Sequence, residues 1–99
     1  MADTPQPYRL PNALFPTGQL MITPNARRVV GMEQAATALA RHSKGDWGDV
    51  DAHDRKANED ALREGTRLFS VYRSLDGRKF WIITERDRSL TTILLPEDY

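Results

Sequence analysis

The sequence predicts an α+β domain in which helices precede an antiparallel sheet. Residues 24–64 hold alanine-rich segments with apolar side chains at helical spacing. Residues 67–95 hold three β-rich runs separated by short polar turns. A chain of 99 residues has room for one modest core. We therefore expect a short N-terminal strand, two to three helices and a three-stranded antiparallel β-meander, with the helices packed on one face.

The first 17 residues differ from the rest in composition. They hold four of the six prolines, namely Pro5, Pro7, Pro11 and Pro16. Proline disfavours helices and central strands, so residues 1–17 are predicted to be a proline-rich extended arm or tail, and residues 18–99 the single domain. The arm contains the apolar side chains Tyr8, Leu10, Leu14 and Phe15, which suit docking, either on the protein's own sheet edge or on a partner. Plain disorder of the arm is the third alternative.

Local signals delimit the first elements. Residues 19–22 are a short strand candidate, which can add a fourth strand to the predicted meander. Thr23 can cap a helix and Pro24 suits its first position, which predicts a short helix over residues 26–30. Gly31 is expected to break or bend this helix.

Two longer helices follow. An alanine-rich segment over residues 33–42 ends in basic residues that complement the helix dipole. The next helix, over residues 51–64, begins at Asp51 and stops at Gly65. Its apolar stripe is thin, so we expect it to lie on the surface and contact the sheet by a narrow face.

The last third reads as β-structure. Strands are predicted over residues 67–73, 79–85 and 90–95. Asp76 and Gly77 form a strong hairpin signal between the first two. The second is apolar at four consecutive positions, which indicates a central strand. The third is a candidate for an exposed edge, and edges invite pairing.

Composition excludes several classes of function. There is no cysteine, so disulfides, thiolate nucleophiles and zinc sites with cysteine ligands are ruled out. The formal net charge is zero, which disfavours binding by phosphate neutralisation but leaves nucleic acid open as a partner. No signal peptide or membrane span is recognisable, so we expect a cytoplasmic protein without membrane association. We expect no cofactor.

Residues 41–54 concentrate both histidines, four aspartates and a glycine-flanked tryptophan. The segment is either a site or only a helix junction. His42 and His53 are eleven positions apart in the sequence, too far for a familiar ligand pair, and we predict no metal site. Trp47 either plugs the core or forms an exposed interaction hot spot. Asp46 and His53 complete the interaction candidates here.

The remaining candidates are basic. Acid–base chemistry on a phosphate needs an acid and a base near cationic groups that bind the phosphate. We take His42, Arg67 and Arg73 as weak catalytic candidates for these roles. Arg86 and Arg88 lie in a turn of alternating charge, which is either a recognition knob or a set of local ion pairs.

Part of the chain resembles a known family. The similarity spans about residues 19–99 and is carried by residues 22–26, 41–42, 45–48, 81–89 and 91–96. These segments resemble a family of small bacterial proteins labelled hypothetical or plasmid-related, and sometimes type I restriction endonuclease subunit. The resemblance implies a bacterial or mobile-element protein and no particular activity.

Our leading hypothesis is a small non-catalytic accessory or interaction protein with a protein partner. A RelE-like or BrnT-like ribonuclease toxin, or another nucleic-acid enzyme, is the alternative, on a likeness of architecture. A third is an acidic-surface inhibitor of a host defence enzyme, since residues 46–64 hold seven acids against three bases. The sequence does not indicate the oligomeric state.

Overall fold

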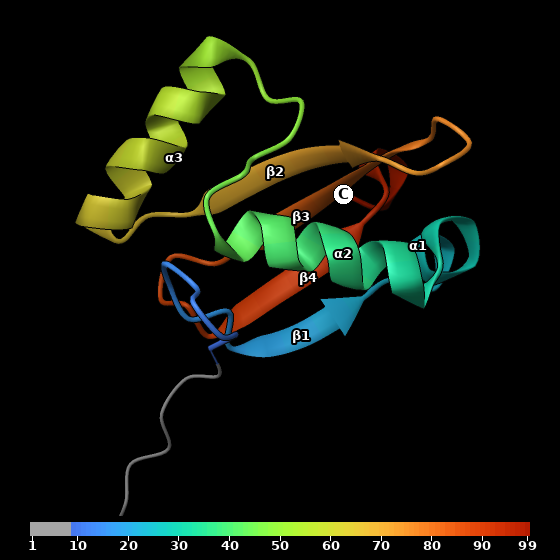
Figure 1. Cartoon of the computed structure of the whole chain (residues 1–99), viewed down its shortest axis with the longest axis horizontal. Helices are drawn as coiled ribbons and strands as arrows, with labels where there is room; N and C mark the ends of the chain where they lie inside the picture. The colour runs from blue at the N-terminus through green and yellow to red at the C-terminus, as the bar shows by residue number, and fades with distance from the viewer. Residues whose placement is uncertain (1–8) are drawn as a thin grey trace, which may run out of the picture.

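The fold is α+β, as predicted, with three helices and a four-stranded sheet within residues 9–99 of the computed structural model (Figure 1). The structure describes residues 9–99, so the first eight residues of the expected arm lie outside the described residues. The elements are β1 (Gln19–Ile22), α1 (Pro24–Val30), α2 (Met32–Ser43), α3 (Ala52–Glu64), β2 (Leu68–Arg73), β3 (Lys79–Thr84), β4 (Leu90–Leu94) and a final 3-10 turn (Pro96–Asp98).

Helices α1 and α3 begin at the predicted capping residues, and α2 extends one residue beyond each end of the predicted range 33–42. The Thr23 side chain accepts a hydrogen bond from the backbone of Ala26, and Asp51 accepts one from Asp54. Gly65 ends α3 in the left-handed conformation, with φ of 73°. None of the helices within residues 9–99 is long and apolar enough to cross a membrane.

The sheet has the strand order β1-β4-β3-β2. The predicted meander is confirmed, because β2 pairs antiparallel with β3 and β3 pairs antiparallel with β4. The β2–β3 hairpin turns at Gly77, which has φ of 88° and donates its backbone N–H to the Ser74 carbonyl at 2.9 Å.

The expected N-terminal strand is confirmed as β1 and adds a fourth strand to the sheet. It pairs parallel to β4, with Gln19 opposite Leu90 and Ile22 opposite Ile93. The parallel pairing is possible because all three helices and two strands separate β1 from β4. The expectation that the last strand lies at an edge is therefore wrong, since β4 is interior.

The helices do not all cover one face, which corrects a second expectation. Helices α1 and α2 pack on one face, whereas α3 lies beyond the outer side of β2 (Figure 1). The reason is the thin apolar stripe of α3. Ala57 is exposed, and only Asn58 and Ala61 of this helix are buried.

The buried side chains form two clusters. One lies between the helices α1 and α2 and the sheet, and includes Val30, Leu39, Phe80 and Ile82. The other, the Trp47 cluster, is formed by Phe15, Trp47, Val50, Ala61, Leu68 and Val71. Phe15 belongs to the predicted arm, and the neighbouring Leu14 donates its backbone N–H to the Ser43 carbonyl at 2.8 Å. This part of the arm therefore packs on the domain.

Candidate functional site

His42 lies on the inner side of α2 and is fully buried. Its Nδ1 atom is 2.6 Å from Ser70 Oγ on β2, and its Nε2 atom is 2.9 Å from Thr84 Oγ1 on β3. Thr84 Oγ1 lies 2.7 Å from Thr91 Oγ1 on β4, and the Thr91 hydroxyl donates to the Thr17 carbonyl at 2.7 Å. We call these five residues the His42 chain.

The His42 chain has a single direction. Because Thr91 gives its hydroxyl proton to a carbonyl, it accepts from Thr84. Thr84 has then used its own proton and must accept from His42, so Nε2 carries the imidazole proton. Nδ1 is left as an acceptor for the Ser70 hydroxyl. The geometry thus assigns the tautomer of a neutral imidazole.

Burial keeps His42 neutral. Removal from water, followed by the nearby positive charge of Arg88, lowers the pKa of His42 to about 3. A buried, neutral imidazole whose two nitrogens are both occupied connects α2 to the sheet. It is not placed to exchange a proton with a substrate at the surface.

The other two catalytic candidates lie elsewhere. Arg67 is exposed and donates from Nη2 to the Tyr99 hydroxyl at 2.7 Å. Arg73 is also exposed, with Nε 3.3 Å from Asp49 Oδ2. The structure therefore does not bring these arginines into one pocket with the buried His42.

Trp47 is a core residue and not an exposed hot spot. It is 1% exposed, stacks on Phe15 with ring centroids 6.2 Å apart, and meets the His42 ring edge-on at 5.7 Å. Its indole Nε1 donates to Glu59 Oε2 on α3 at 3.1 Å. The tryptophan therefore connects α3 to the region around His42.

Asp46 stabilises the loop after α2 through hydrogen bonds. Its carboxylate accepts from Arg41 Nε at 2.7 Å and from the Gly48 backbone N–H at 3.3 Å. The hydrogen bond from Arg41 lowers the pKa of Asp46. The Arg41 guanidinium in turn lies 4.8 Å from the centroid of the Tyr72 ring. These contacts are internal to the fold.

His53 is separated from His42 by its environment, because its side chain is 90% exposed. Within the described residues, Asp51, His53 and Asp54 have potential ligand atoms within 4.8 Å of one another. The Asp51 carboxylate already caps α3 by accepting the Asp54 N–H at 2.8 Å. The two histidines do not form one site.

Arg86 and Arg88 have different surroundings. Arg86 is exposed, whereas Arg88 has φ of 60° and lies against α3. Arg88 Nη2 donates to the Ala61 carbonyl at 3.0 Å and Nη1 to the Thr66 carbonyl at 2.6 Å. Arg88 thus satisfies carbonyls at the C-terminal end of the helix and the segment after it.

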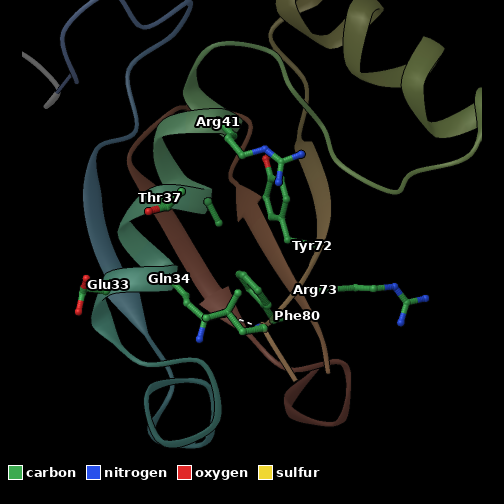
Figure 2. Close-up of a pocket in the computed structure, with 9 residues that line it drawn as sticks. Glu33, Gln34, Thr37, Arg41, Tyr72, Arg73 and Phe80 are labelled. Atoms are coloured by element: carbon green, nitrogen blue, oxygen red, sulfur yellow. Dashed lines mark hydrogen bonds between the residues drawn. The ribbon is translucent and has the colours of Figure 1, made fainter. Parts of the chain in front are cut away.

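A cleft with a volume of about 330 Å³ lies between α2 and the β2–β3 hairpin. Phe80 and Tyr72 contribute aromatic surface, and Gln34 and Thr37 polar groups (Figure 2). Arg41 lies along the Tyr72 ring, whereas Arg73 points away from the cleft (Figure 2). Three of the polar lining residues are engaged within the fold, because Gln34 Oε1 accepts from the Leu75 backbone N–H at 2.6 Å, Arg41 pairs with Asp46 and Arg73 pairs with Asp49.

On the outer side of β2, the outward backbone groups of Phe69 and Val71 are hydrogen-bonded by α3 and the loop before it, and we call this edge the sealed edge. Asn58 Oδ1 accepts from the Phe69 N–H at 3.0 Å, and Asn58 Nδ2 donates to the Phe69 carbonyl at 2.7 Å. Val71 is paired likewise, because its N–H donates to the Trp47 carbonyl at 3.1 Å and its carbonyl accepts from Asp49 at 2.7 Å. An amide side chain and a loop backbone thus take the place of a further strand.

The outer side of β1 is arranged differently. The Gln19 N–H donates to the Ser89 carbonyl, just before β4, at 2.9 Å, and the Thr23 N–H donates to the Ile93 carbonyl on β4 at 3.0 Å. Since backbone groups alternate along a strand, those of Leu20 and Ile22 face away from β4. Leu20 is 42% exposed and Met21 49% exposed, and β1 carries neither charge nor proline.

An apolar groove of about 210 Å³ lies beside this edge, between β1 and α2. Its lining is formed by Leu20, Met21, Ile22, Met32, Ala35, Ala36, Leu39 and Ile93. Met32 on the rim is 58% exposed. We call the β1 edge together with this groove the open-edge surface.

The open-edge surface holds residues that the sequence analysis did not single out. The available signal was the uncharged strand at residues 19–22, since edge strands are usually protected by charge or proline. The lack of charge in this strand indicates an unprotected edge only when β1 is known to be an outer strand of the sheet.

Comparison of the chain with protein-family models, curated proteins and solved structures found no match.

Proposed function

We propose that this protein is a small non-catalytic interaction protein that binds another polypeptide strand at the open-edge surface. One observation carries the proposal. Within residues 9–99, the outward backbone groups of β2 at Phe69 and Val71 are hydrogen-bonded, whereas those of β1 at Leu20 and Ile22 have no partner and the side chains of Leu20 and Met21 are exposed. The proposed setting is the bacterial cytoplasm, which rests on the family resemblance given above.

Strand addition explains how such a surface would bind. An extended segment can pair its backbone with the outward N–H and carbonyl groups of Leu20 and Ile22. Its alternate side chains can enter the groove beside α2. The flexible thioethers of Met21 and Met32 adapt to irregular apolar shapes, which suits such a contact.

Photocrosslinking in cells tests this proposal. A photoreactive benzoylphenylalanine replaces Met21, at the centre of the edge, and in a control chain it replaces Leu75, which is 92% exposed on the β2–β3 hairpin. We expect a discrete crosslinked band for the first chain and none for the second.

The variant Leu20→Pro shows whether the crosslink depends on strand pairing. Proline removes an N–H that faces outward, so the ladder to β4 is retained and the domain is expected to fold. The crosslink at position 21 should disappear in this background. A band that persists with Leu20→Pro, or no band at all in the otherwise unchanged chain, would refute the proposed function.

A further inference from the structure

We propose that the strand bound at the open-edge surface is β1 of a second copy of this chain, so that the protein is a twofold-symmetric dimer with one continuous sheet. The inference rests on the proposed function, because it names the occupant of the same edge. Three features of the structure favour a second copy: the register that β1 allows, its lack of charge, and the sealing of the opposite edge.

The backbone of β1 favours one antiparallel register. The residues with outward-facing groups are Leu20 and Ile22, and a twofold axis beside Met21 places Leu20 of each copy opposite Ile22 of the other. Both outward residues of both copies then form hydrogen-bonded pairs. A register centred on either Leu20 or Ile22 would pair only one of them in this way within β1.

The charge distribution is compatible with this symmetry. A twofold axis brings each side chain close to its own copy, so charged residues on the edge would repel one another. The four residues of β1 carry no charge, and the chain as a whole has a formal net charge of zero. Self-association therefore meets little electrostatic opposition.

The dimer also covers apolar surface. A twofold axis perpendicular to the sheet leaves the α2 helices of both copies on the same face of the joined sheet. Both apolar grooves then face the line where the two β1 strands pair. Met32 and the small Ala36 lie on this side of α2. The exposed parts of Leu20 and Met21 are then removed from water in both copies.

The sealed edge explains why assembly would stop at two. In the dimer the outer strands of the joined sheet are the two β2 strands, whose outward groups at Phe69 and Val71 are already bonded to Asn58 and to the loop before α3. The remaining outward position of β2, Arg73, is exposed and charged, so the assembly closes as a dimer and does not extend into a fibre.

Cysteine scanning tests the register, because the natural chain contains no cysteine. Met21→Cys would place two thiols across the axis at a Cα separation of about 4.5 Å, within the range of a disulfide. Leu20→Cys is the matched control, since its two copies would lie about 8 Å apart. Leu75→Cys, on the exposed hairpin, measures disulfides formed by random collision.

We expect Met21→Cys to form a disulfide-linked dimer under mild oxidation, with at least tenfold less product from the other two variants. Light scattering should give twice the chain mass for the unmodified protein and the chain mass for Leu20→Pro. If Met21→Cys gives no more product than Leu75→Cys, the proposed register is wrong.

The result also separates this inference from the proposed function. A protein that remains monomeric over a wide concentration range, while position 21 crosslinks to a different polypeptide in a Leu20-dependent way, overturns the dimer and leaves the proposed function standing. Absence of both the dimer and any crosslink overturns both.

Discussion

The two outer strands of the sheet differ in how their outward backbone groups are satisfied. On β2, Asn58 and the segment around Trp47 pair the groups of Phe69 and Val71. On β1, the groups of Leu20 and Ile22 point outward from an uncharged strand. The difference teaches that this fold protects one edge with its own chain, and it makes the other edge the place to look for a second polypeptide.

The largest expected effect comes from removing the residue that anchors the sealed edge. Trp47→Ala should lower the free energy of unfolding by about 3–5 kcal/mol, because it empties the centre of the Trp47 cluster. Trp47→Phe, which retains most of the apolar volume, should cost less. Urea unfolding measures both, and equal stability of Trp47→Ala and the natural protein would contradict the role assigned to this core.

Unsealing β2 directly is expected to have a smaller effect on stability and a visible effect on assembly. Asn58→Ala leaves both backbone groups of Phe69 without their side-chain partner and should cost about 1–3 kcal/mol. Species larger than a dimer should then appear in light scattering, because a second edge is free to pair. Leu75→Ala, on the exposed hairpin, should change neither property.

Acidification should act on the sealed side of the sheet, since β1 has no titratable side chain. The pKa of His42 is about 3 in the folded protein and 6.5 in its ordinary state, so the unfolded chain binds more protons between these values. Stability is fully present above pH 6.5 and falls as the pH decreases, with a contribution from His42 of up to about 1.4 kcal/mol per pH unit.

His42→Gln tests the origin of that slope. Urea unfolding between pH 5 and 8 should show a shallower pH dependence for this variant, together with lower stability at pH 8. Leu20→Ala should retain the natural slope. An unchanged slope in His42→Gln would mean that other groups cause the acid sensitivity.

Local chemistry explains why most of the fold could be predicted from the sequence. Thr23, Asp51, Gly65 and Gly77 act within a few residues of themselves, so their capping and turn roles are visible in the chain. The pairing of β1 with β4 could not be read in this way, because Gln19 and Leu90 are far apart in sequence. The position of α3 depends on a side-chain contact between Asn58 and the backbone of Phe69, which no local capping or turn rule predicts.

The candidate site was less predictable than the fold for a related reason. His42, Asp46 and Trp47 have versatile chemistry, but the same groups also satisfy internal hydrogen bonds, and only burial separates the two uses. Leu20 and Met32 have no distinctive chemistry and become candidates through exposure alone. Exposure is set by the tertiary arrangement, which composition and spacing do not reveal.

The directionality of the His42 chain has a consequence for how the sequence can change over evolutionary time. Each hydroxyl between Ser70 and Thr91 donates in one direction, so a single replacement leaves a buried neighbour unpaired on one side. Substitutions at positions 42, 70, 84 and 91 are therefore expected to be epistatic, harmful one at a time and tolerated together. Relatives of this chain should either keep all four polar residues or replace them jointly with apolar ones.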